Sequence, residues 1–211
     1  MPTPYRLALI AALARRESDP PDRTGQKPRP PRDGGAAAAP AYDCDHAHRA
    51  VGAHEAIEAE PGELPTLALD AAALVIVGAL RAWVAPVLHP GRDHPAWQDV
   101  FSLARLPASA AAAFDRALRL IAARAIRSID VRCPSCPAVS ADERLLVAVV
   151  SALQRDLTVL GHRLLCDWLR EGDAAEAVSA LSHLAAALRG AGLVAAEDLP
   201  GRPHARAGVL H

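Results

Sequence analysis

The sequence predicts an all-α fold, a compact bundle of five to six helices preceded by a Pro-rich disordered arm. Hydrophobic residues make up 51% of the 211 residues and aromatic residues only 3%, so the core must be built from Leu, Val, Ile and Ala, which suits packed helices. After residue 65, apolar residues recur every three or four positions, which is the spacing of one helix face. Capping residues precede several of these runs and further favour helices over strands.

Composition divides the chain into a bundle domain and flanking segments. The apolar run from Leu7 to Ala14 is followed by Arg15 and Arg16, which favours an amphipathic helix over a signal peptide. The stretch after it is rich in Pro and Gly and has too little apolar surface to fold. The predicted regions are a short amphipathic helix at 1–17, a disordered linker at 18–43, an acidic His-containing transitional segment at 44–64, the helical bundle domain at 65–199 and a disordered tail at 200–211.

Two helices are expected in the first part of the domain. Thr66 is a suitable cap for a helix that runs to about Ala85, and its apolar residues fall on all sides, as in a helix at the centre of a bundle. Pro86 is expected to end this helix. Pro95 suits the first turn of a short second helix, which should stop near Leu106.

The clearest amphipathic pattern follows. Its apolar positions share one helix face: Phe114, Leu118, Ile121, Ala125 and Ile129. Four arginines fall on the opposite face: Arg116, Arg119, Arg124 and Arg127. We interpret them as a solvated basic face. Binding of an anion or a nucleic acid is the alternative, which the net charge of −1 disfavours.

The last part of the domain begins with a strong helix signal. Ser140 and Glu143 have the spacing of a capping box, and an apolar stripe continues from there to about Leu169. Either one long helix forms, or the chain breaks into two helices within Arg155–Gly161, where helix propensity is low. A final helix is expected at about Asp173–Arg189.

The pair Cys133 and Cys136 raises the question of metal binding. His162 and Cys166 are four residues apart and would share a helix face, so these four residues form a candidate zinc site. A continuous helix would carry His162 about 33 Å from its start, far beyond a coordination bond. The candidate site therefore requires a helix break near Gly161.

Other chemistry for cysteine and histidine has less support. Thioredoxin-like catalysis is not expected, because Pro137 separates Cys136 from the helix and no strand pattern surrounds the pair. Cys44, His46 and His48 are interpreted as part of an exposed polar segment, with a weak metal site as the alternative.

Enzymatic activity has no motif to support it, since the sequence contains no phosphate loop, nucleophile elbow or dinucleotide fingerprint. We therefore favour a non-enzymatic protein–protein interaction or regulatory module, with a protein partner or a homo-oligomer. A metal-binding or redox-sensing protein that uses Cys133 and Cys136 is the alternative, and nucleic-acid binding is a weaker one. Four cysteines without a secretion signal favour the cytoplasm, and the apolar run Ala71–Leu80 is too short for a transmembrane segment.

Overall fold

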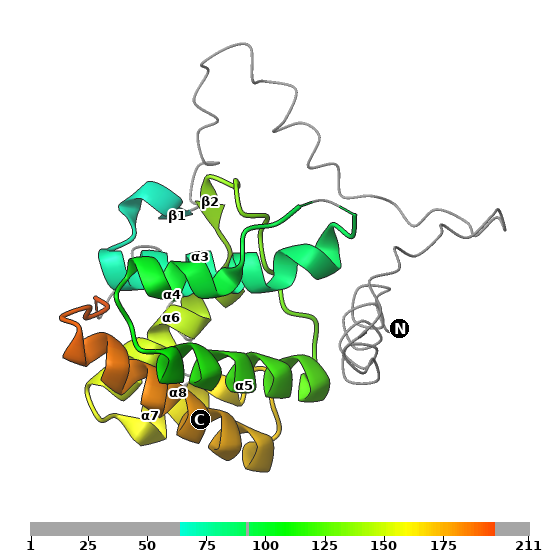
Figure 1. Cartoon of the computed structure of the whole chain (residues 1–211). Coiled ribbons are helices and arrows are strands. Elements are labelled where there is room, and N and C mark those ends of the chain that lie inside the picture. Colours follow the sequence, from blue (N-terminus) through cyan, green and yellow to red (C-terminus); the bar gives the residue numbers. More distant parts are fainter. Residues whose placement is uncertain (1–63, 92, 197–211) are drawn as a thin grey trace, which may run out of the picture.

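A computed structural model describes residues 64–91 and 93–196, and within them it confirms an all-α bundle (Figure 1). Expectations for the chain before residue 64 and after residue 196 lie outside the described residues. The elements are β1 (Leu64–Pro65), η1 (Thr66–Ala68), α3 (Ala71–Leu88), α4 (Trp97–Leu103), α5 (Ala108–Arg124), β2 (Ala138–Val139), α6 (Ala141–Gln154), α7 (Thr158–Leu165) and α8 (Glu171–Gly190).

Helix α3 begins and ends later than its sequence predicts. Asp70 is its N-cap and accepts a hydrogen bond from the Ala73 amide at 2.8 Å, whereas Thr66 starts the short 3-10 turn η1. The predicted start at Thr66 is therefore wrong. The predicted end at Pro86 is also wrong, because the helix continues through this proline to Leu88. A proline so near the end of a helix removes one hydrogen bond and leaves a single turn to follow.

Helix α3 is largely buried and packs against α4 and α6. It is the one described helix that is long and apolar enough to cross a membrane, but 61% of it is buried by the rest of the domain. A buried helix in a core passes the same test of length and composition, so this is weak evidence for a membrane span. Its single charged residue, Arg81, is only 3% exposed.

Helices α4 and α5 follow on one side of α3. Helix α4 ends at Leu103, one turn before the predicted end. Helix α5 buries Phe114, Leu118 and Ile121, which confirms the apolar face predicted from their spacing. The helix stops at Arg124, however, so Ile129 lies in the loop that follows. The amide of Ile126 donates to the carbonyl of Trp168 at 2.8 Å, and this contact joins the loop to the segment between α7 and α8.

The chain breaks between α6 and α7, which confirms the second alternative for residues 140–169. Helix α6 ends at Gln154, and Asp156 adopts a positive φ of 61° before α7 begins at Thr158. Gly161 then packs directly on α6. A Cβ atom at this position would lie 2.9 Å from Cδ2 of Leu153, which is too close for the two helices to pack as they do.

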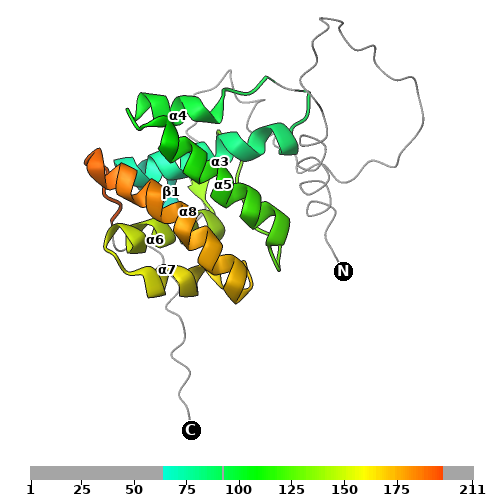
Figure 2. The ribbon, with the colours of Figure 1, turned by 60° about the horizontal axis from the view of Figure 1, so that its bottom comes forward.

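Helix α8 completes the bundle by lying alongside α5 and packing against α6 and α7 (Figure 2). Its bounds, Glu171–Gly190, agree with the predicted final helix. The two-residue strands β1 and β2 pair antiparallel, with Leu64 opposite Val139. They join the start of the domain to the segment just before α6, and no sequence pattern predicted them.

Candidate functional site

The carboxylate of Glu143, at the start of α6, is one of two buried carboxylates with several hydrogen-bond donors in the described residues. It is fully buried, and the guanidinium of Arg81 donates to both of its oxygens at 2.7 and 2.9 Å. The backbone amides of Ser140 and Arg132 donate to it as well, at 2.9 and 3.1 Å. We refer to Arg81, Ser140 and Glu143 as the Glu143 cluster. Its carboxylate accepts four hydrogen bonds, two of them charge-assisted by the guanidinium of Arg81.

The remaining donors of Arg81 bind the loop that contains the cysteines. One terminal nitrogen donates to the carbonyl of Cys136 at 2.8 Å, and the other donates to the carbonyl of Ala138 at 2.7 Å. Burial by itself would lower the pKa of Arg81, but its hydrogen bond to Glu143 and the attraction of nearby negative charge, first that of Glu143, together outweigh burial and the pKa is raised. A single buried arginine on α3 thus fixes both the loop and the first turn of α6.

The capping box that the sequence predicts is part of this cluster. The Ser140 hydroxyl accepts from the Glu143 amide at 3.0 Å and donates to the carbonyl of Asp130 at 2.6 Å. Sequence reasoning identified Ser140 and Glu143 but missed Arg81. The available signal was a charge inside the most apolar helix, since a buried guanidinium requires a partner.

A second buried carboxylate lies beside the first. Arg127 donates to both oxygens of Asp142, at 2.6 and 3.1 Å, and also binds Asp167. The Asp130 amide and the Trp168 indole donate to Asp142 as well, at 2.6 and 3.2 Å. Burial by itself would raise the pKa of Asp142, but these hydrogen bonds, led by that of Arg127, lower it. Both carboxylates are thus committed to structure, and neither is free to act as a general acid or base.

The candidate zinc ligands lie in two separate places. Cys133 and Cys136 occupy the ends of a turn before β2. His162 and Cys166 lie at α7, where Sγ of Cys166 is 3.8 Å from Nδ1 of His162. The chain does break before Gly161, yet within residues 64–91 and 93–196 no group of three or more His, Cys, Asp or Glu side chains is placed to hold a metal ion. The break turns α7 onto α8, where His162 Nε2 lies 3.0 Å from the carbonyl of Glu171.

Two other predicted features have different outcomes. Cys44, His46 and His48 lie outside the described residues. The four arginines each have a carboxylate partner, and Arg127 lies in the loop after α5 instead of on the helix. The ion pairs are Arg116 with Glu176 at 3.3 Å, Arg119 with Asp115 at 2.7 Å, Arg124 with Asp173 at 3.5 Å, and Arg127 with Asp142 and Asp167. Acidic residues of α8 thus pair with Arg116 and Arg124, while the partners of Arg119 and Arg127 lie elsewhere in the bundle.

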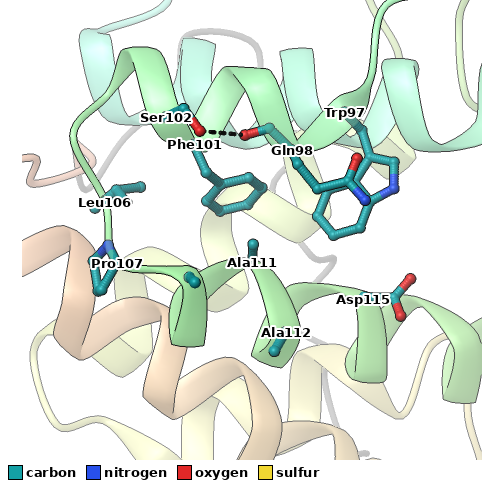
Figure 3. Close-up of a pocket in the computed structure, with 10 residues that line it drawn as sticks. Trp97, Gln98, Phe101, Ser102, Leu106, Pro107, Ala111, Ala112 and Asp115 are labelled. Atoms are coloured by element: carbon teal, nitrogen blue, oxygen red, sulfur yellow. Dashed lines mark hydrogen bonds between the residues drawn. The ribbon is translucent and has the colours of Figure 1, made fainter.

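A groove of about 390 Å³ lies between α4 and α5 (Figure 3). On the α4 side it is lined by Trp97 and Phe101, whose rings meet edge to face with centroids 5.9 Å apart. On the α5 side it is lined by small side chains, including Ala111 and Ala112. The complete lining is Trp97, Gln98, Phe101, Ser102, Leu106, Pro107, Ala108, Ala111, Ala112 and Asp115.

Asp115 is the one charged residue in this lining, and both of its oxygens have partners. One accepts from the indole of Trp83 at 2.8 Å, and the other accepts from Arg119 at 2.7 Å. The groove therefore offers apolar contact and shape, with no ionised group left to orient a polar ligand. Sequence reasoning missed this site because it exists only once α4 has folded over α5.

No protein-family model, curated protein or solved structure matches the chain. The class that its fold defines is an all-α helical bundle. Its function has to be inferred from the groove and from the chemistry of the loop residues.

Proposed function

We propose that the chain is a non-enzymatic cytoplasmic interaction module and that its α4–α5 groove binds the apolar face of a short amphipathic helix. The groove itself is the observation that supports this proposal. On one side the half-buried ring of Trp97, which packs on the buried Phe101, offers an apolar contact, and alanines on the other side allow the backbone of a docked helix to approach closely. The cytoplasmic assignment is supported by Cys133, Cys136 and Cys166, which are free thiols.

A polar small molecule fits the groove less well than an apolar helix does. Sites for such ligands combine an apolar pocket with a few convergent polar groups that fix the ligand's orientation. Here the only carboxylate is already paired, and the Ser102 hydroxyl is directed to the carbonyl of Gln98 at 3.3 Å. Binding would therefore depend on burial of apolar surface, which is how helices dock in grooves.

The occupant we propose is the chain's own segment 5–16. Sixty-three residues precede Leu64, and they include the apolar run from Leu7 to Ala14, for which the sequence predicts an amphipathic helix. A flexible chain as long as residues 18–63 spans about 37 Å, compared with a radius of gyration of about 14 Å for a domain of this size. Such a tether gives an effective concentration in the millimolar range, so even weak affinity would fill the groove. A partner helix would then act by displacing this segment.

The test compares the full-length wild-type chain with its Ile10→Asp variant. A fluorescently labelled peptide of residues 4–17 is titrated into each protein, and binding is measured by fluorescence anisotropy. Burial of one large apolar side chain contributes about 1.5–3 kcal/mol, so a charge at position 10 should empty the groove. We expect the peptide to bind the Ile10→Asp chain at least about tenfold more tightly than the wild-type chain.

Matched variants on α5 locate the binding. Ala112→Arg, made in the Ile10→Asp chain, places a long charged side chain in the groove and should abolish peptide binding. Ser109→Arg lies on the same exposed end of α5 but outside the groove lining, and it should bind like its parent. Equal binding to all four proteins, or no binding to any, would contradict the groove. If the peptide binds the wild-type and Ile10→Asp chains equally well and Ala112→Arg abolishes that binding, segment 5–16 is rejected as the occupant of the groove.

A further inference from the structure

The loop between α5 and α6 contains a pair of thiols, Cys133 and Cys136, whose chemistry does not depend on the groove. The amide of Cys136 donates to the carbonyl of Cys133 at 3.0 Å, so Pro134 and Ser135 are the central residues of a tight turn. Proline is favoured at the first central position of type I and type II turns. A type II turn needs a positive φ at the second, and Ser135 is not among the residues with positive φ. The turn is therefore of type I and unstrained.

This turn brings the Cα atoms of the two cysteines within the range found in disulfides. A β-turn keeps its first and fourth Cα atoms less than about 7 Å apart. The Cα atoms of a disulfide lie about 4.4–6.8 Å apart, so the backbone needs little change to join Cys133 to Cys136. Both side chains are free thiols and both are partly exposed, which gives a small oxidant access to them.

The end of the turn is anchored in the core. The carbonyl of Cys136 accepts from Arg81 at 2.8 Å and from the Thr66 hydroxyl at 3.2 Å. The carbonyl of Pro137 accepts from the Thr66 amide at 2.6 Å. Arg81 is itself held by the buried Glu143. The folded chain therefore keeps the two cysteines near each other, whereas an unfolded chain must find that conformation by chance.

We propose that Cys133 and Cys136 form a reversible thiol–disulfide site that uses a peroxide as its oxidant. One thiolate attacks a peroxide oxygen, the O–O bond breaks, and hydroxide leaves to give a sulfenic acid. The second thiol then attacks the sulfenic sulfur, and the S–O bond breaks with loss of water. The two thiols are oxidised by two electrons, and hydrogen peroxide is reduced to two molecules of water. A small-molecule thiol reverses the reaction by disulfide exchange.

The first test maps the product in the full-length chain. After treatment with hydrogen peroxide, peptide mass mapping should find an intramolecular Cys133–Cys136 disulfide, and Cys166 should still react with an alkylating agent. Cys133→Ser and Cys136→Ser should each abolish this disulfide, whereas Cys44→Ser and Cys166→Ser should retain it. Disulfides between chains, or a disulfide that joins Cys44 to either turn cysteine, would overturn the proposal.

The second test measures whether the folded chain favours the Cys133–Cys136 disulfide more than the unfolded chain does. The equilibrium between dithiol and disulfide is measured in glutathione buffers, for the native chain and for the chain in strong denaturant, with Cys44→Ser and Cys166→Ser in both. We expect the equilibrium constant for disulfide formation to be at least about tenfold larger in the native chain than in the denatured chain, because the anchored turn already holds the two cysteines close together. An equal or smaller constant in the native chain would show that the turn does not favour the disulfide and would overturn the proposal.

Discussion

The Glu143 cluster and the α4–α5 groove differ in what each leaves available to a ligand. In the cluster, two charged side chains are buried and their polar atoms are bonded to one another or to the backbone. In the groove, the lining is mainly apolar and a volume of about 390 Å³ is left unfilled. The charged residues of the cluster therefore hold the fold together, and the binding that we propose involves a surface with almost no charge.

The arginines of the chain give the same contrast within one residue type. Arg81 is 3% exposed and bonds a buried carboxylate and two carbonyls, whereas Arg116 is 71% exposed and has one ion pair at 3.3 Å. A buried charge without its partner is costly, while an exposed pair competes with water and salt. The number of ion pairs is thus a poor guide to stability, because the contribution of each pair depends on how deeply it is buried.

The largest effect should come from breaking the buried pair. Glu143→Ala leaves the Arg81 charge uncompensated in the core, and we expect the free energy of unfolding to fall by about 3–5 kcal/mol. Urea denaturation measures this as a lower midpoint. Replacing both residues by apolar ones, Arg81→Met with Glu143→Leu, should cost less than Glu143→Ala alone. A Glu143→Ala variant as stable as the wild type would show that the cluster does not stabilise the fold.

A smaller, pH-dependent effect should come from the neighbouring carboxylate. Because the pKa of Asp142 is lowered in the folded chain, its contribution is present above the ordinary pKa of about 4 and is lost as the pH falls through the lowered value. We expect Asp142→Asn to cost about 1–3 kcal/mol at pH 7 and progressively less below pH 4. Unfolding in urea between pH 7 and pH 3 tests this. A cost that does not change with pH would contradict the role of the ionised carboxylate.

Packing between α6 and α7 should show the difference between a filled and an open site. Gly161→Ala places a methyl group 2.9 Å from the buried Leu153 side chain and should cost about 1–2 kcal/mol. Gly172→Ala on α8 is the matched control, because no atom lies within 4 Å of the new Cβ. There the higher helix propensity of alanine should stabilise the chain by up to about 1 kcal/mol. Thermal unfolding measures the change in stability of both variants. Changes of the same sign in the two variants would contradict this packing of α7 on α6.

The smallest effect is expected on the exposed arginine face. Arg116→Ala and Arg124→Ala each remove one exposed ion pair with α8, and each should change the free energy of unfolding by less than about 1 kcal/mol. High salt should reduce even this difference. A loss of several kcal/mol in either variant would mean that these surface pairs matter as much as the buried one.

Sequence reasoning was most successful where the signal is local. The capping box and the buried face of α5 each depend on residues within a few turns of one another, and both were predicted. Arg81 and Glu143 are 62 positions apart, so only the folded chain shows that they meet. The start of α3 was misjudged because Thr66 and Asp70 are both good caps, and tertiary contacts of Thr66 with the cysteine loop select Asp70. The groove needs two helices in place, and no periodicity predicts it.

The proposal that the groove holds segment 5–16 is tested most directly by hydrogen exchange. Backbone exchange is measured by mass spectrometry for the full-length wild-type and Ile10→Asp chains under identical native conditions. We predict faster exchange in the variant within residues 97–112, which form α4 and the first turns of α5, and unchanged exchange around the Glu143 cluster. Identical exchange of residues 97–112 in both proteins would contradict the proposal, since an emptied groove must lose the protection that its occupant provides.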